Sequence, residues 1–323
     1  MTIRSLLSVL ADGRFHSGRE LGEQLQVSRS AIWKQIRKVE ELGVEIYSVK
    51  GRGYRLPGGL DLLEISAVRD LLKAEAASQL GEVALELSME STNLEALSLS
   101  QRQDCHGRLF VAEQQTAGRG RRGRQWVSPF GRNLYFSLVW RFEHGAAALE
   151  GLSLVVGLAL KKALAASGIE GVGLKWPNDL LFGNAKLAGI LLEMTGDASG
   201  ECQVIIGIGL NVAMQPEQAE AIDQPWTDLQ SIKGGTVSRN ELLAAVLNEL
   251  VPMLDRFKQF GFEPFAEEWM AANAFQSLPV ELQLGDQLIQ GVCRGVNGSG
   301  ALLLEREGET KAYHGGEISV RRA

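Results

Sequence analysis

The segment Leu109–Arg124, LFVAEQQTAGRGRRGR, joins a short apolar run to a loop rich in glycine and arginine. The run Leu109–Ala112 has the length and composition of a buried strand. The loop Gly118–Arg124 contains the pattern Gly-x-Gly-x-x-Gly, which in dinucleotide-binding folds opens a helix directly. The next residues, Gln125-Trp-Val-Ser-Pro129, do not begin a helix, and four arginines would crowd the packing of helix on strand. The segment is therefore not the dinucleotide-binding loop of a Rossmann fold, and the chain contains no Gly-x-x-x-x-Gly-Lys-Ser/Thr motif of a P-loop protein.

The arginines of this loop predict an anion-binding site. Guanidinium groups bind phosphate or carboxylate oxygens in a bidentate manner, and glycines give a loop the freedom to close over a ligand. We therefore expect a nucleotide or a similar anion beneath the loop; the alternative is an exposed basic loop that contacts nucleic acid. Trp126, just beyond it, either stacks on a base or belongs to the core.

A second polar cluster, Lys175-Trp-Pro-Asn-Asp179, follows the apolar run Val172–Leu174. Its proline fixes a turn that presents Asn178 and Asp179. Lys186 begins the next apolar run and supplies another cation for a reacting carboxylate or phosphate. The cluster therefore adds to the expected anion site.

Strands and helices mix between about residues 65 and 270. Gly189 and the segment Gly207-Ile-Gly-Leu-Asn211 lie in or at the end of apolar runs, where glycine permits a close approach of the backbone. The expected strands include 109–112, 134–139 and 204–208, and the expected helices are 149–167 and 240–260. This pattern indicates an α+β domain in which helices pack on a mixed sheet.

The first sixty residues predict a helix-turn-helix. Ile3, Leu6, Leu7 and Leu10 lie on one face of a short helix. Ser17-Gly-Arg-Glu20 is a capping box that opens a second helix. Ser28 is a suitable N-cap for a third helix, in which Ile32, Ile36, Val39 and Leu42 face inward and after which Gly43 ends the helix.

The outward face of the third helix and the segment after it predict DNA binding. The run Val44–Val49, a turn Lys50-Gly-Arg-Gly53 and the run Tyr54–Leu56 read as the two strands of a wing. Basic and polar residues on a recognition helix and a wing contact phosphates and base edges. The alternative is a small interaction module with a solvated helix face. The expected DNA contacts are Arg29, Ser30, Trp33, Lys34, Arg37 and Arg52.

The C-terminal residues predict a small all-β module. Val280–Leu284 alternates apolar and polar residues, and Gly285-Asp286, Asn297-Gly298 and Glu307-Gly308 are turn signals between short apolar runs. We expect the units 1–60, 65–272 and 276–323, with Pro57-Gly-Gly59 as a linker after the first.

Charge and composition limit the functional classes. The net charge of −6 argues against a general polyanion binder, but residues 1–60 carry ten Lys/Arg against six Asp/Glu. The longest apolar stretch, Gly151–Leu160, is too short to cross a bilayer, and no signal peptide is recognisable. Cys105, Cys202 and Cys293 lie far apart, which disfavours disulfides and structural zinc. We expect a cytoplasmic protein that is not bound to a membrane.

Several motifs together closely resemble the signature blocks of biotin–protein ligases. They are Ser91-Thr-Asn93, Glu113–Arg124, Lys175–Asp179, Lys186–Ile190 and Gly207–Asn211. With the winged helix and a C-terminal module that looks like the family's SH3-like barrel, the chain resembles the bifunctional class that also represses biotin synthesis genes. The resemblance extends from the first helix to Gly315-Gly-Glu-Ile318. The stretch 214–237 matches no motif, and we expect a variable loop there.

The resemblance implies a reaction in two steps. Biotin's carboxylate attacks the α-phosphate of ATP and gives biotinyl-5′-adenylate and pyrophosphate, with Mg²⁺ as cofactor. A lysine of the biotin carboxyl carrier protein of acetyl-CoA carboxylase then receives the biotin as an amide. Fixed cations are needed because an anion attacks an anion.

The resemblance also implies roles for individual residues. Lys186 bridges the biotin carboxylate and the α-phosphate, and Arg119 and Arg121 close over the adenylate; these three are the expected catalytic residues. Asp179 either accepts a hydrogen bond from the bound substrate or assists magnesium. No residue is assigned as a metal ligand. The expected biotin contacts are Ser91, Thr92, Asn93, Gln115, Gly118, Arg119, Gly120, Arg121, Lys186 and Gly189. The expected ATP contacts are Arg121, Arg122, Trp126, Asn178, Asp179 and Asn211.

Regulation is a further implication. In this family the adenylate promotes homodimers, which bind a two-part operator. One alternative is a DNA-binding biotin sensor without catalysis, which would be expected to lack Lys186 or the loop arginines. Another is a ligase for lipoate or a similar acid, against which the arginine loop and Lys175–Asp179 argue.

Overall fold

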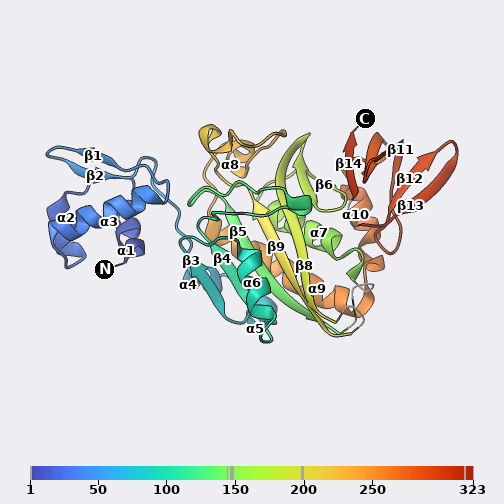
Figure 1. Ribbon diagram of the computed structural model, residues 1–323, viewed down its shortest axis with the longest axis horizontal. Coiled ribbons are helices and arrows are strands. Elements are labelled where there is room, and N and C mark those ends of the chain that lie inside the picture. The colour runs from blue at the N-terminus through green and yellow to red at the C-terminus, as the bar shows by residue number, and fades with distance from the viewer. Residues whose placement is uncertain (1, 144, 146–148, 198–199, 316–317, 323) are drawn as a thin grey trace.

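The computed structural model describes residues 2–143, 145, 149–197, 200–315 and 318–322. Over these residues the chain forms three units in a row, with the N-terminal helices at one end and the C-terminal strands at the other (Figure 1). No helix within the described ranges is long and apolar enough to cross a membrane. Residues 316 and 317, in the middle of the motif 315–318, lie outside the described residues.

The N-terminal unit is the winged helix that the sequence predicts. As expected, the Ser17 hydroxyl accepts from the Glu20 amide and the Glu20 carboxylate accepts from the Ser17 amide, at 3.1 and 2.7 Å. Ser28 caps the third helix by accepting from the amide of Ala31. The elements are α1 (Ile3–Leu10), α2 (Gly18–Gln24), α3 (Arg29–Glu41), β1 (Tyr47–Val49) and β2 (Gly53–Arg55).

The first strand of the wing is shorter than predicted. It begins at Tyr47 rather than Val44, and it pairs with β2 over three residues, from Tyr47↔Arg55 to Val49↔Gly53. The ladder cannot continue far past Arg55 because Pro57 has no N–H to donate.

The central unit is built on a seven-stranded mixed sheet. Its strand order is β3-β4-β5-β9-β8-β7-β6, in which only β3 and β4 run parallel. This confirms the mixed sheet; β4 has the predicted bounds, whereas β5 and β9 extend the predicted runs by a few residues. The strands are β3 (Val83–Glu86), β4 (Leu109–Ala112), β5 (Leu134–Phe142), β6 (Val172–Lys175), β7 (Asp179–Phe182), β8 (Ala185–Gly196) and β9 (Cys202–Leu210).

Helices cover both faces of this sheet (Figure 1). The long helices α7 (Leu152–Ala166) and α9 (Arg239–Phe260) pack on each other and on one face, where they bury side chains such as Leu158 and Leu250. Helix α6 (Thr92–Ser100) covers the other face through a smaller cluster around Ala96. The shorter helices are α4 (Ile65–Asp70), α5 (Ala74–Gln79), α8 (Leu229–Lys233) and α10 (Ala266–Ala272).

The C-terminal unit is a five-stranded antiparallel sheet, and its turns fall where the sequence predicts them. Its buried side chains belong to the same apolar cluster as those of α7 and α9, and the Trp176 indole N–H donates to the Gly300 carbonyl at 3.0 Å. The unit is therefore packed against the central one. In order across the sheet, the strands are β13 (Glu309–Tyr313), β12 (Leu302–Arg306), β11 (Gln287–Val296), β10 (Pro279–Leu284) and β14 (Ile318–Arg322). The domain limits at 60, 65, 272 and 276 stay predictions.

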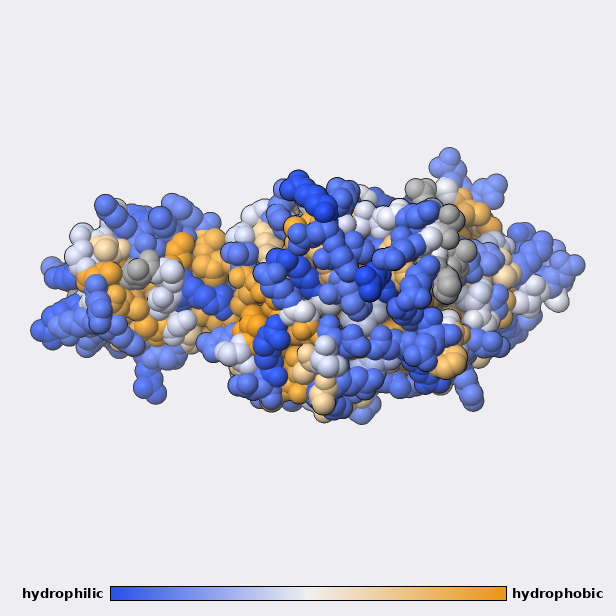
Figure 2. Space-filling model, turned by 90° about the horizontal axis from the view of Figure 1, so that it is seen from below, coloured by the Kyte–Doolittle hydropathy of each residue, from blue (hydrophilic) through white to orange (hydrophobic). Residues whose placement is uncertain are grey.

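The winged helix also packs on the central unit. Phe130 and Leu62 are buried in the same cluster as the winged-helix core, with Leu60 and Leu87 partly buried beside them. Figure 2 shows hydrophobic surface gathered over this junction. The segment after Gly59 is therefore fixed against both units.

A buried ion pair holds this segment in place. Arg239, 2% exposed, lies 2.7 Å from the Glu113 carboxylate, which is 0% exposed. The Arg239 guanidinium also donates to the Asp61 carbonyl, and its backbone amide donates to the Asp61 carboxylate at 2.6 Å. The second Glu113 oxygen accepts from the Leu63 amide at 2.8 Å. Three chain segments far apart in sequence thus meet at one internal charge pair.

We predict that Arg239→Met lowers the free energy of unfolding by about 3–5 kcal/mol, because it leaves the Glu113 charge buried and uncompensated. Urea unfolding measures the change. Arg19→Met, which removes an exposed pair with Glu23, is the control and should cost less than about 0.5 kcal/mol. Equal effects of the two substitutions would contradict the account.

Candidate functional site

A cavity of about 670 Å³ lies over the middle strands of the central sheet. The lining comes from the arginine loop, the β6–β7 hairpin, β8, β9 and the C-terminal strand β14. Among the described lining residues, eight carry cationic side chains, whereas the carboxylates are Asp179 and Asp223. Such an excess of positive charge in a concave site favours an anionic ligand. The cations are Arg119, Arg121, Arg122, Arg124, Lys175, Lys186, Arg321 and Arg322.

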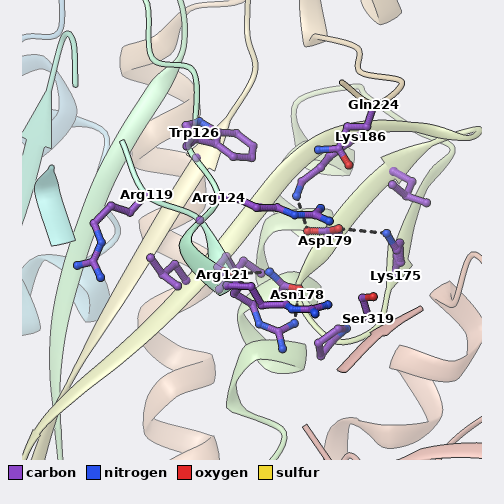
Figure 3. A pocket seen from close by; sticks show the side chains of 18 of the residues that line it. Arg119, Arg121, Arg124, Trp126, Lys175, Asn178, Asp179, Lys186, Gln224 and Ser319 are labelled. Carbon is purple, nitrogen blue, oxygen red and sulfur yellow. Dashed lines mark hydrogen bonds and ion pairs between the residues drawn. The ribbon is translucent and has the colours of Figure 1, made fainter. Parts of the chain in front are cut away.

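The strongest electrostatic feature of the cavity is a carboxylate between two ammonium groups. Asp179 lies 2.8 Å from Lys186 Nζ through Oδ1 and 3.3 Å from Lys175 Nζ through Oδ2 (Figure 3). The strands explain the arrangement, since Asp179 begins β7 and faces Lys175 at the end of β6. All three side chains are mostly buried.

These contacts control ionisation. Burial alone would raise the pKa of Asp179, but the ammonium groups of Lys186 and Lys175 outweigh it and lower that pKa below its usual value. Burial lowers the pKa of Lys175, and Asp179 opposes that shift. Asp179 is therefore an anion at neutral pH, and it neutralises part of the positive charge of the cavity.

Arg121 joins three parts of the chain. Its Nη1 donates to the Asn178 side chain at 2.9 Å, and its Nη2 donates to the Ile318 carbonyl of β14 at 3.4 Å. Asn178 in turn donates to the Ile190 carbonyl of β8. Arg121 therefore connects the arginine loop to the hairpin and to the C-terminal unit (Figure 3).

Two strand glycines make room for Trp126. A Cβ at Gly209 would lie 2.4 Å from Trp126 Cε2, and one at Gly189 would lie 2.9 Å from Trp126 Cζ3. The ring therefore lies directly against the backbone of the sheet, and Lys186 Nζ is 5.3 Å from its centroid. Trp126 lines the cavity, which favours the prediction that it faces a ligand over an ordinary core position.

A polar network forms the other end of the cavity. The side-chain oxygen of Gln115 accepts a hydrogen bond from the Thr92 backbone amide at 2.9 Å. The side-chain nitrogen of Gln115 donates to the Ser128 hydroxyl at 3.0 Å. The buried Ser137 hydroxyl lies 2.8 Å from Thr92 Oγ1 and donates to Asn93 Oδ1 at 2.6 Å. These groups give fixed donors and acceptors for a neutral polar ligand group.

Arg119 lies apart from the other loop arginines. Its guanidinium is 3.0 Å from the Glu193 carboxylate, which also accepts a hydrogen bond from the side-chain amide of Asn93 at 2.9 Å. In Figure 3 the side chain points away from Asp179 and Lys186. In this structure Arg119 is therefore at the polar end of the cavity and does not cover the lysines.

Most of the predicted ligand contacts line one cavity, and two do not. Gly118 lies behind the lining, where a Cβ would meet the Trp126 carbonyl at 2.4 Å. Asn211 is buried and donates to the Thr227 carbonyl at 3.1 Å, so it supports the following loop instead of facing the cavity. The predicted contacts in the lining are Ser91, Thr92, Asn93, Gln115, Arg119, Gly120, Arg121, Arg122, Trp126, Asn178, Asp179, Lys186 and Gly189.

Sequence reasoning missed two parts of the lining. The segment Asp223-Gln-Pro225 lies in the stretch expected to be a variable loop, and it lines the cavity beside Lys186. The Lys186 backbone amide donates to the Pro225 carbonyl at 2.9 Å. Nothing in the local pattern signals this contact. Ser319 and Arg321 of β14 also line the cavity, although their alternation indicates only a strand.

The predicted DNA-binding residues are all exposed. Arg29, Ser30, Trp33, Lys34 and Arg37 are exposed on α3. Arg52 is exposed in the wing turn, and its guanidinium lies 4.2 Å from the centroid of the Phe15 ring. These residues are separate from the cavity lining.

Family models match the three units in order. Residues 86–211 match the biotin/lipoate A/B protein ligase family, residues 2–55 an HTH domain and residues 279–321 the biotin protein ligase C-terminal domain.

Similar proteins cover nearly the whole chain. The bifunctional ligase/repressor BirA of Salmonella typhimurium is 44% identical, over 99% of this chain and 97% of that protein; BirA of Escherichia coli is 43% identical, over 98% and 97%. The structure of a biotin protein ligase from Aquifex aeolicus in complex with biotin and ATP is 34% identical, with a TM-score of 0.66, over 75% of this chain and 99% of that one. These likenesses confirm the predicted fold class, a helix-turn-helix, a mixed-sheet domain and a C-terminal antiparallel sheet.

We predict that Gly209→Ala displaces Trp126 and lowers the free energy of unfolding by about 1–3 kcal/mol, because the new methyl group has no room beneath the indole. Urea unfolding and a crystal structure of the variant measure both effects. Gly235→Ala, with open space around the position, is the matched control and should leave stability nearly unchanged. A Gly209→Ala variant as stable as this control would contradict the close packing of Trp126 on Gly209.

Proposed function

The chain belongs to the biotin/lipoate A/B protein ligase family, and we propose from this premise that it activates biotin with ATP and transfers it to a protein lysine. The observation that carries the proposal is the placement of Lys186 and Arg121 in one cavity with the polar network around Gln115. Cations suit a carboxylate and a phosphate, and the network suits a neutral ureido ring. Biotin and ATP together carry both kinds of group.

Activation requires two anions to meet. Biotin's carboxylate oxygen attacks the α-phosphorus of ATP, and pyrophosphate leaves. We assign Lys186 to the space between the carboxylate and the α-phosphate, where its ammonium group would offset their repulsion. Asp179 pairs with Lys186 at 2.8 Å and so holds this ammonium group in position.

The tryptophan and the arginine loop complete the nucleotide side. Trp126 offers a ring face for a base, and Asn178 and Arg121 offer polar groups beside it. Arg121 is fixed to the hairpin and to β14 and therefore closes the cavity between the central and C-terminal units. Such closure would shield the adenylate from water.

Transfer completes the reaction. The acceptor's lysine amine attacks the acyl carbon of biotinyl-5′-adenylate, an amide forms, and AMP leaves with the electron pair of the broken acyl–phosphate bond. We propose the biotin carboxyl carrier protein of acetyl-CoA carboxylase as the acceptor. No side chain of the cavity needs to form a covalent intermediate.

Magnesium would enter with the nucleotide. The described residues contain no cluster of three His, Cys, Asp or Glu side chains that could hold a metal by themselves. Mg²⁺ commonly binds through substrate phosphates with one or two carboxylates, which Asp179 or Asp223 would supply. When bound it would neutralise phosphate charge.

The winged helix gives the chain a second role. We propose that α3 and the wing bind operator DNA and that an adenylate-bound homodimer represses biotin synthesis genes, because a symmetric dimer matches a two-part operator. With such an acceptor and operator, the protein would act in the cytoplasm. A regulator without catalysis is disfavoured, since Lys186 and Arg121 both line the cavity.

We predict that Lys186→Met reduces the rate of biotin transfer to the carrier protein about 10²–10³-fold, since it removes the cation opposite the reacting anions. Labelled biotin and the purified carrier measure the rate. Lys233→Met, an exposed position at the end of α8, is the matched control and should retain full activity. Transfer by Lys186→Met within a few-fold of wild type would refute the assignment.

A second prediction concerns DNA. Lys34→Glu or Arg37→Glu should abolish operator binding, because each reverses a charge on the exposed face of α3 next to phosphates. A gel-shift titration with biotin and ATP measures binding, and acceptor labelling by the same preparation tests whether the fold is intact. Parallel loss of both activities would contradict the separation of the two sites.

A further inference from the structure

Helix α3 carries one large apolar side chain in the middle of its cationic surface. Trp33 is 52% exposed, and Lys34, Arg37 and Lys38 around it are exposed as well. The opposite face of α3, with Ile32 and the other inward residues, fills the core without it. The fold therefore gives no reason for an indole at this position.

The indole is held on the outer surface by a neighbour one turn further along. The Arg37 guanidinium lies 5.3 Å from the centroid of the Trp33 ring and 3.5 Å from the Glu40 carboxylate. A guanidinium over an aromatic face is a stabilising contact at an exposed site. Trp33 is thus presented in a defined place in the N-terminal half of α3.

The surrounding charge indicates what contacts this ring. Residues 1–60 carry ten Lys/Arg against six Asp/Glu, whereas the whole chain is acidic. A cationic helix face fits the phosphates that line the major groove of DNA. Among the base edges exposed in that groove, the thymine C5-methyl is the apolar group that an aromatic side chain can bury.

We propose that Trp33 is a specificity-determining residue that contacts a thymine methyl group, so that each half-site of the operator requires thymine at one position. The inference rests on the DNA binding proposed above and adds the base that this side chain selects. Lys34 and Arg37 hold the helix in the groove, and Trp33 supplies the apolar contact.

The test begins with selection. The full-length protein, with biotin and ATP present, selects duplexes from a random-sequence library. Each thymine of the selected sequence is then replaced by uracil, which keeps every hydrogen-bonding group and removes only the methyl. We expect one position per half-site at which uracil weakens binding about fourfold, as for the loss of one buried methyl group.

Two substitutions connect this position to Trp33. Trp33→Asn should lose the preference for thymine over uracil at that position, whereas Trp33→Phe should keep it because the aromatic surface remains. Trp33 is half-exposed and outside the core, so both variants should unfold at the wild-type temperature.

Several outcomes would overturn the inference. Uniform tolerance of uracil would exclude a methyl contact. Loss of the selected sequence by Trp33→Phe as well would assign the contact to the indole N–H. If Trp33→Asn selects the same sequence but changes the monomer–dimer equilibrium in sedimentation, the ring contacts a second copy of this chain instead of DNA. If wild type selects no sequence, the proposed DNA binding fails together with this inference.

Discussion

The ion triad of Asp179 with Lys175 and Lys186 is the constraint on which the site depends. The cavity concentrates positive charge, and like charges in a partly buried site repel unless an anion lies between them. Asp179 is that anion, and the two lysines lower its pKa against the effect of burial. The triad fixes the Lys186 ammonium group in the cavity, where the proposed reaction brings two substrate anions together.

The cavity exists only when distant segments are assembled. The arginine loop, the β6–β7 hairpin and the C-terminal strand β14 meet through the hydrogen bonds of Arg121, and glycines at 189 and 209 admit Trp126 to the floor. At the junction with the winged helix, the Arg239–Glu113 pair fixes the segment between the winged helix and the central unit. Glu113 lies two residues before Gln115, so the same short segment contacts the interdomain connection and the polar end of the cavity.

Local patterns predicted the winged helix and the longer helices and strands of the central unit to within a few residues, and they predicted an anion site at the loop arginines and Lys186; most other lining residues came from the resemblance to the ligase family. The capping box at Ser17 and the N-cap at Ser28 form as predicted because capping is a contact within one turn. The loop arginines were recognisable because guanidinium groups on a glycine-rich loop suit an anion, whereas Lys186 alone is a weak signal and gained weight only beside them. The contact of Pro225 with Lys186, the role of Ser137 beneath Asn93 and the position of Arg119 at Glu193 were not predictable, because each depends on how segments 39 to 74 residues apart are brought together. Asn211 was expected to face the nucleotide, but the same tertiary packing places it under the loop at Thr227.

The most direct test of the central claim is the biotin-dependent exchange of labelled pyrophosphate into ATP by the wild-type protein, with lipoate and octanoate as parallel acids. The account predicts exchange with biotin and none above background with the other two, because the polar network around Gln115 and Asn93 suits a ureido ring that they lack. Exchange with lipoate or octanoate at a comparable rate, or no exchange with any acid by folded protein, would contradict it.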